Sequence, residues 1–86
     1  MRILYKPSFV RQFQKLERDL QDEVLEKIEE FTDSRNHRKL KVHRLTGLLA
    51  GFYSFSVNYR YRIVFSFSKR KTEATLLAVG DHEVYR

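Results

Sequence analysis

The chain is 86 residues long, with 42% hydrophobic residues and a formal net charge of +6. It has no cysteine, which excludes disulfide bonds and cysteine-ligated zinc. No apolar run approaches the roughly 20 residues of a membrane helix, and Lys6 and Arg11 interrupt the N-terminal apolar residues. We therefore expect one soluble, cytoplasmic domain, residues 1–86, with no membrane partner; its basic excess favours a polyanion or an acidic protein as partner.

The first third of the chain predicts a strand followed by helical structure. Ile3, Leu4 and Tyr5 form a short apolar run that Pro7 ends, and Ser8 is the expected N-cap of a helix. Apolar residues then recur at helical spacing in two sets: Phe9, Phe13, Leu16 and Leu20, followed by Val24, Leu25, Ile28 and Phe31. One bent helix would fit this pattern, but we prefer two helices packed as a hairpin, the second starting near Asp22.

The second half of the chain is predicted to be β-structure after a basic segment that runs from residue 35 to residue 44. Residues 52–57 alternate in polarity, residues 61–67 are rich in aromatic and β-branched residues, and residues 72–79 form a last apolar strand after the charged loop 68–71. The order predicts an α+β fold: an N-terminal strand, a two-helix hairpin, then a three-stranded antiparallel meander with the helices on one sheet face.

The alternation of these strands predicts one apolar face and one polar face. Arg60 and Arg62 are one residue apart and would point to the same side of a strand, because successive side chains alternate. Tyr53, Phe55 and Val57 lie on the apolar side. The polar side is either an ordinary solvated face or the basic floor of an anion-binding site.

The basic segment before the strands contains Lys39, Lys41 and His43, which alternate with apolar residues. In an extended chain this places three basic groups, followed by Arg44, either on a phosphate-contacting strip or along a solvated edge. His37 has no such context and is expected in a loop. The three histidines lack metal-ligand spacing, so no metal site is predicted, and no Gly-rich phosphate loop is present.

The last seven residues, 80–86, concentrate acid–base chemistry directly after a predicted strand. His82 can serve as a general acid or base near neutral pH, or can be an exposed histidine of the chain end. Tyr85 is either an aromatic anchor against the sheet or a residue that stacks on a base or donates a proton. Arg86 is most simply a solvated charge.

The chain resembles toxins of the RelE/ParE superfamily, from bacterial and archaeal toxin–antitoxin pairs, over nearly its whole length. The stretches that carry the resemblance are residues 43–47 (HRLTG), residues 52–65 (FYSFSVNYRYRIVF) and residues 79–85 (VGDHEVY). It implies the β-α-α-β-β-β fold of those toxins. It also implies a metal-independent endoribonuclease, an mRNA interferase that cuts mRNA in the ribosomal A site without a cofactor.

The resemblance implies roles for particular residues. Arg62 matches a strand arginine near the scissile phosphate of RelE-like members, whereas His43 and His82 match histidines of YafQ-like members, and Tyr85 matches the C-terminal aromatic of either branch. These four are the expected catalytic residues. The residues expected to contact RNA are Lys39, Lys41, Arg44, Arg60 and Arg86.

The chain departs from both branches within the strand pair. Ser54 and Ser56 stand about where RelE-like members carry lysines, and Ser56 and Arg60 where YafQ-like members carry a histidine and an aspartate. Arg60 is a hypothetical replacement for the missing charge. The alternatives are a ParE-like toxin that poisons DNA gyrase without nuclease chemistry, and a degenerate toxin that only binds its antitoxin. In each case the expected partner is a short acidic or amphipathic antitoxin.

Overall fold

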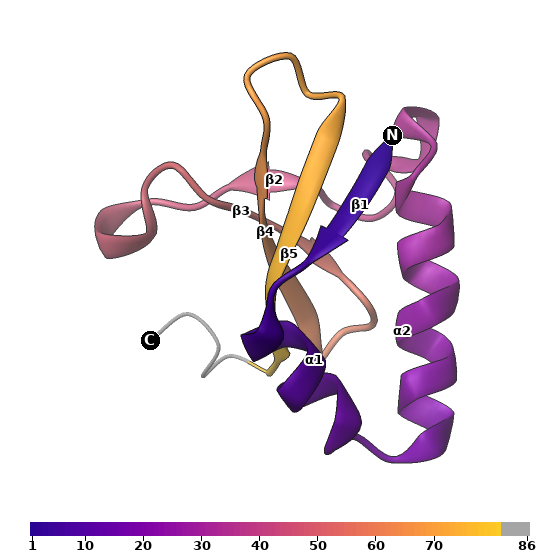
Figure 1. Cartoon of the computed structure of the whole chain (residues 1–86). Coiled ribbons are helices and arrows are strands. Elements are labelled where there is room, and N and C mark those ends of the chain that lie inside the picture. The colour runs from indigo at the N-terminus through magenta and orange to yellow at the C-terminus, as the bar shows by residue number, and fades with distance from the viewer. Residues whose placement is uncertain (82–86) are drawn as a thin grey trace.

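The computed structural model describes residues 1–81 as an α+β fold with two helices and a five-stranded mixed sheet (Figure 1). This confirms the predicted fold class. The elements in chain order are β1 (Arg2–Tyr5), α1 (Pro7–Gln14), α2 (Arg18–Phe31), the 3₁₀ turn η1 (Ser34–Asn36), β2 (His43–Arg44), the 3₁₀ turn η2 (Gly47–Leu49), β3 (Tyr53–Ser56), β4 (Arg62–Phe67) and β5 (Glu73–Gly80). Neither described helix has the length and apolar character needed to cross a membrane.

The strands are ordered β1-β5-β4-β3-β2 across the sheet. β3, β4 and β5 pair antiparallel, as predicted for the meander, and β1 joins the far edge parallel to β5 (Figure 1). The two-residue strand β2 lies within the basic segment and pairs antiparallel with β3, with His43 opposite Ser54 and Arg44 opposite Tyr53. The last two residues of the basic segment therefore form the edge of the sheet.

The helical region consists of two helices, as preferred from the sequence, but both begin earlier than expected. Lys6 is the N-cap of α1 and Pro7 occupies its first turn, because a proline at that position loses no hydrogen bond. The prediction of Ser8 as N-cap was therefore wrong. The Ser8 hydroxyl instead donates to the Leu77 carbonyl of β5 at 2.6 Å, which fastens α1 to the sheet. α2 starts at Arg18 rather than near Asp22.

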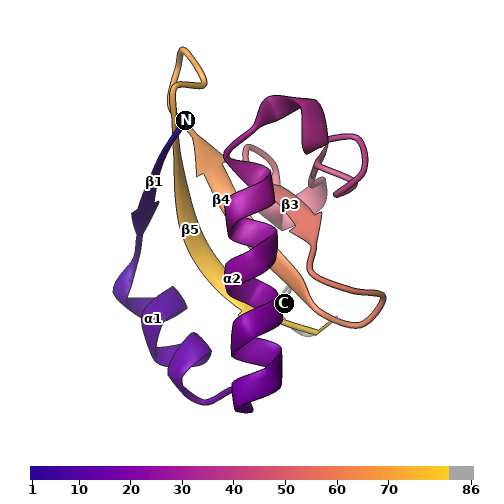
Figure 2. The ribbon, with the colours of Figure 1, turned by 90° about the vertical axis from the view of Figure 1, so that its right-hand side faces the viewer.

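The core forms between α2 and one face of the sheet (Figure 2). Phe31, the last residue of α2, is fully buried and stacks on Phe55 with ring centroids 4.4 Å apart, while Phe65 meets it edge-on at 4.8 Å. Ile63 and Leu76 complete the buried face. The apolar residues of β3 and β4 lie on the core face, as their alternation predicted. A β-bulge does interrupt the pairing of β4 with β5, but its extra residue, Leu77, lies in β5, so the alternation along β3 and β4 is unbroken.

The opposite face is less open than the alternation suggests. Ser54 is 0% exposed and Val64 only 4%, so the expectation of an open face was wrong at these two positions. Ser54 is small and is flanked in its cross-strand row by the larger His43 and Val64. Arg60 also departs from its expected place on the strand. It lies in the turn before β4, where its amide donates to the Asn58 side chain at 2.9 Å.

Candidate functional site

A cavity of about 510 Å³ opens beside the ends of β3 and β4 and gathers most of the basic residues that the sequence singled out. It has no Asp or Glu among its described lining residues, and five basic residues line it: Lys27, Lys39, Lys41, His43 and Arg62. They come from α2, from the turn before β2, from β2 itself and from β4. Side chains from four segments thus converge on one hollow, which we call the basic cavity.

A tight turn, not an extended chain, places Lys41 at this cavity. Residues 37–41 form successive turns in which the Leu40 amide bonds to the Asn36 carbonyl at 2.9 Å. Lys41 then adopts φ 59°, in the left-handed region, and reverses the chain. The predicted alternation of residues 39–43 was therefore wrong, because residues 39 to 41 follow a turn. The fold nevertheless brings Lys39, Lys41 and His43 together.

His43 and Arg62 approach the cavity from two strands on either side of β3. His43 pairs with Ser54 and Arg62 with Ser56, and both serines point away from the helices. The exposed His43 ring holds Nδ1 2.8 Å from the Lys41 carbonyl oxygen, which orients the imidazole. Arg62 is half-buried, and its Nη1 donates to the Arg60 carbonyl at 3.4 Å.

One carboxylate of α2 lowers the positive charge of the basic cavity. Lys39 Nζ lies 2.6 Å from Glu30 Oε1, and Lys27 Nζ lies 3.4 Å from Glu30 Oε2. The contact with Lys39, reinforced by Lys27, lowers the pKa of Glu30 below its ordinary value. Lys41 forms no ion pair with any residue of the described range, so its charge is available to an anion.

Two predicted RNA-contacting residues lie elsewhere. Arg44 follows His43 on β2 but points to the other side, where its guanidinium lies 5.8 Å from the centre of the Tyr53 ring. Arg60 is exposed in its turn, with its guanidinium 5.5 Å from the Tyr61 ring centre, and does not line the basic cavity. The predicted residues His82, Tyr85 and Arg86 lie outside the described residues.

Two lining residues were not singled out from the sequence. Lys27 belongs to the helical pattern and carries no signal that separates it from other helix-surface lysines. Tyr59 is 92% exposed at the rim of the basic cavity. Asn58 holds this rim, because its side chain donates to Glu23 at 2.8 Å and accepts from the Tyr61 amide at 2.8 Å. In the sequence, an aromatic residue directly after a turn asparagine is the signal that would have pointed to Tyr59.

His37 packs against the core and takes no part in the basic cavity. Its ring stacks on Phe31 at 4.7 Å, and its Nε2 lies 2.9 Å from the Phe31 carbonyl oxygen. Within residues 1–81 no three His, Asp or Glu side chains come together as a metal-binding cluster.

Solved structures share this fold over nearly the whole chain. The toxin–antitoxin complex RelBE2 from Mycobacterium tuberculosis matches with TM-score 0.77 and 21% identity, covering 94% of this chain and 96% of that one. An archaeal RelE–RelB complex from Pyrococcus horikoshii matches with TM-score 0.72 and 19% identity, covering 93% and 92%. A YafQ mutant from Escherichia coli matches with TM-score 0.72 and 14% identity, covering 99% and 98%.

The chain therefore has the fold of the RelE/ParE-type toxins, as the sequence resemblance implied. At 14–21% identity these similarities establish the fold alone. No protein-family model and no curated protein matches the sequence.

Proposed function

We propose that this protein is the toxin of a type II toxin–antitoxin system and acts in the cytoplasm as a ribosome-dependent mRNA endoribonuclease. In this proposal residues 1–86 form one toxin domain. The observation that carries the proposal is the convergence of His43, Arg62 and Lys41 on one cavity of about 510 Å³ within a RelE-type fold. An imidazole beside a guanidinium and an ammonium is suited to phosphodiester chemistry.

The proposed reaction takes its nucleophile from the RNA. A base removes the proton of a 2′-hydroxyl, the 2′-oxygen forms a bond to the adjacent phosphorus, and the bond to the 5′-oxygen breaks as an acid protonates it. The products are a 2′,3′-cyclic phosphate and a free 5′-hydroxyl, so the atoms balance without water or metal. His43 is the proposed residue for proton transfer, and Arg62 is suited to the phosphate because its guanidinium binds two oxygens at once.

The remaining predicted residues complete the proposal. His82 and Tyr85, which lie outside the described residues, are the further catalytic candidates, and Arg86 is a candidate RNA contact. Lys39 and Lys41 would hold flanking phosphates. Arg60 lies in the turn and outside the basic cavity. We therefore assign the positive charge that replaces the missing strand lysines to Lys41 and Lys27, which line the basic cavity.

The proposed protein partner is a cognate antitoxin. The structural neighbours include toxin–antitoxin complexes, among them RelBE2 and the archaeal RelE–RelB pair. We propose that an acidic segment of the antitoxin covers the basic cavity and neutralises Lys41 and Arg62, which would block the approach of RNA.

The test is a translation-coupled RNA cleavage assay. The wild type is compared with Arg62→Ala, His43→Ala, His82→Ala and Tyr85→Phe. Lys69→Ala is the matched control, because it removes one exposed charge in the β4–β5 loop, outside the basic cavity. Loss of an electrostatic stabiliser typically lowers a rate by about 10²–10³, so we expect a loss of this order in Arg62→Ala.

Circular dichroism of each variant establishes that it is folded. Unchanged RNA ends together with gyrase-linked DNA breaks would replace the nuclease by a ParE-like activity. An equal loss of cleavage in Lys69→Ala would mean that total charge, and not the basic cavity, accounts for the effect.

A further inference from the structure

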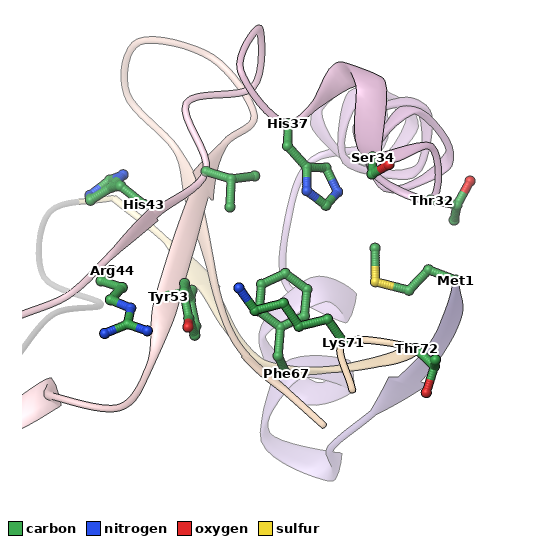
Figure 3. A pocket seen from close by; sticks show the side chains of 11 residues that line it. Met1, Thr32, Ser34, His37, His43, Arg44, Tyr53, Phe67, Lys71 and Thr72 are labelled. Carbon is green, nitrogen blue, oxygen red and sulfur yellow. The ribbon is translucent and has the colours of Figure 1, made fainter. Parts of the chain in front are cut away.

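A second cavity, of about 650 Å³, lies on the other side of β2 (Figure 3). It is bounded by the end of α2, by β2 and β3, and by the loop between β4 and β5. The proposed cleavage chemistry uses none of its side chains except His43, which lines both cavities. We call it the aromatic cavity, after the rings of Tyr53 and Phe67 that line it.

These two rings form an aromatic surface at the cavity, each with a cation beside it (Figure 3). Tyr53 and Phe67 meet nearly perpendicular, with centroids 4.8 Å apart. The Arg44 guanidinium lies 5.8 Å from the centre of Tyr53, and Lys71 Nζ lies 5.5 Å from the centre of Phe67. Both cations are on long, exposed side chains, which can swing from the rings toward an incoming anion.

The charge of the aromatic cavity is positive. No Asp or Glu is among its described lining residues, and neither Arg44 nor Lys71 forms an ion pair within residues 1–81. Thr32, Ser34 and Thr72 also line it. The Thr32 hydroxyl already donates to the Glu29 carbonyl at 2.6 Å, so Ser34 and Thr72 are the hydroxyl-bearing lining residues that we assign to a ligand. A ligand with a planar ring, hydrogen-bonding groups and a phosphate would find an aromatic ring to stack on, hydroxyl groups to bond with and cations to pair with in this cavity.

We propose that the aromatic cavity binds a nucleotide of single-stranded RNA, next to the nucleotide whose phosphate lies at His43 and Arg62. The base stacks on Tyr53 or Phe67, and Arg44 and Lys71 contact its phosphate. The proposal deepens the proposed function and rests on it for the identity of the RNA. Because His43 borders both cavities, one strand that crosses the edge of the sheet at β2 can reach both.

An acidic peptide is the competing occupant of a basic cavity. Carboxylates would pair with Arg44 and Lys71, but they would leave the two aromatic rings without a stacking partner. A nucleotide uses the rings, the cations and the hydroxyl groups together. The structure therefore favours RNA over an acidic peptide.

The first experiment locates the ligand. Backbone amide NMR spectra of the full chain are recorded with adenosine monophosphate, with inorganic phosphate at the same concentration, and with a Glu-rich octapeptide. We expect the nucleotide to shift the resonances of Tyr53, Phe67 and Thr72 more than phosphate does. Equal shifts with phosphate, or shifts with the peptide alone, would overturn the proposal.

The second experiment measures affinity for an octameric RNA with 2′-O-methyl groups throughout, which cannot be cleaved. Arg44→Gln and Lys71→Gln are each expected to weaken binding by about fivefold to tenfold, through the lost phosphate contact and its stacked base. Lys69→Gln, in the same loop as Lys71 but outside the cavity, is the control and is expected to stay within about twofold. Equal weakening in all three variants would overturn the proposal.

The two proposals fail separately because oligonucleotide binding is measured without cleavage. If mRNA stays intact in the translation assay but the nucleotide still shifts the resonances of Tyr53 and Thr72, the proposed nuclease function is wrong and the nucleotide site is retained. If mRNA is cut but Arg44→Gln and Lys71→Gln bind the octamer as the wild type does, the aromatic cavity is not a nucleotide site.

Discussion

At the scale of single residues, Lys41 combines a proposed role in anion binding with backbone strain. Its φ of 59° lies in the left-handed region, where a side chain costs about 1–2 kcal/mol relative to the right-handed conformation. The turn is held by neighbouring bonds, since the Val42 amide bonds to the His37 carbonyl at 2.9 Å and the Leu40 carbonyl accepts from Ser56 at 2.8 Å. A lysine at a strained turn is expected where its charge matters more than its backbone preference.

We expect the variants Lys41→Gly and Lys41→Ala to separate the effect of backbone strain from the effect of charge. Both variants lose the ammonium, so we expect both to bind single-stranded RNA more weakly and to a similar extent. Glycine adopts the left-handed conformation without strain, so Lys41→Gly should exceed Lys41→Ala in free energy of unfolding by about 1 kcal/mol. Urea denaturation and RNA titration measure the two effects. A glycine variant less stable than the alanine variant would contradict the strain argument.

Asp33 supplies a prediction about acid stability. Its side chain accepts from the Arg35 amide at 3.0 Å and pairs with the Arg35 guanidinium at 2.7 Å, and these contacts lower its pKa from 3.8 to about 2. A carboxyl group with a depressed folded-state pKa stabilises the fold above its unfolded pKa, and this contribution disappears as the pH falls through about 2. Asp33→Asn should therefore be less stable than the wild type at neutral pH, with the difference shrinking toward pH 2.

Urea denaturation of the wild type and Asp33→Asn across this pH range measures the difference, and NMR titration of the Asp33 carboxyl measures its pKa directly. Asparagine keeps an acceptor for the Arg35 amide, so the comparison isolates the charge. A stability difference that does not change with pH would show that the ion pair contributes nothing measurable.

At the scale of elements, α2 connects the core to the basic cavity through its last turns. Phe31 fixes the end of the helix between Phe55 and Phe65, and the preceding residue, Glu30, is thereby held where it contacts Lys27 and Lys39. The helix thus supplies Lys27 to the basic cavity and, one turn later, Glu30, whose carboxylate pairs with that lysine.

Glu30→Gln is therefore expected to strengthen RNA binding while it weakens the fold. Loss of the carboxylate releases Lys27 and Lys39 toward phosphates, and we expect affinity for single-stranded RNA to rise by about twofold to fivefold. Because the pKa of Glu30 is lowered in the fold, its contribution to stability exists above the unfolded pKa and is lost on acidification. The variant should therefore be less stable at neutral pH. Glu26→Gln, an exposed site on the same helix, is the control for net charge.

The face of the sheet on which each strand residue lies could be predicted from the sequence, because the direction of the side chains along a strand repeats every two residues. Phe55 and Ile63 lie on the core face as their alternation required. The segment before β2 could not be predicted in the same way, because Lys41 takes a left-handed conformation without the glycine or asparagine that usually marks one. A local polar–apolar alternation was therefore misinterpreted as an extended chain.

The candidate site could be predicted only in part, because it is assembled by tertiary contacts. His43, Lys39, Lys41 and Arg62 were singled out by residue type and pattern, and they meet at the basic cavity. Lys27 was missed because its place there depends on how α2 packs on the sheet, which no local pattern encodes.

At the scale of the whole molecule, the net charge of +6 is segregated. α2 carries Asp19, Asp22 and four glutamates, whereas the cations of both cavities come mainly from β2, its preceding turn, β4 and the β4–β5 loop. Neither cavity has an Asp or Glu among its described lining residues. This separation favours an extended anion that follows the edge across β2 over a compact one that occupies a single cavity.

The salt dependence of RNA binding tests this path. Each phosphate neutralised on a single strand contributes about −0.7 to the slope of log affinity against log salt, so contacts from Arg62, Lys41, Arg44 and Lys71 predict a slope of about −3. Removing one of these cations, as in Arg62→Ala, should make the slope shallower by about 0.7, whereas Lys69→Gln should leave it unchanged. Fluorescence anisotropy with a long single-stranded RNA at several salt concentrations measures it. A slope of about −1.5 that does not respond to Arg44→Gln or Lys71→Gln would confine the RNA to the basic cavity.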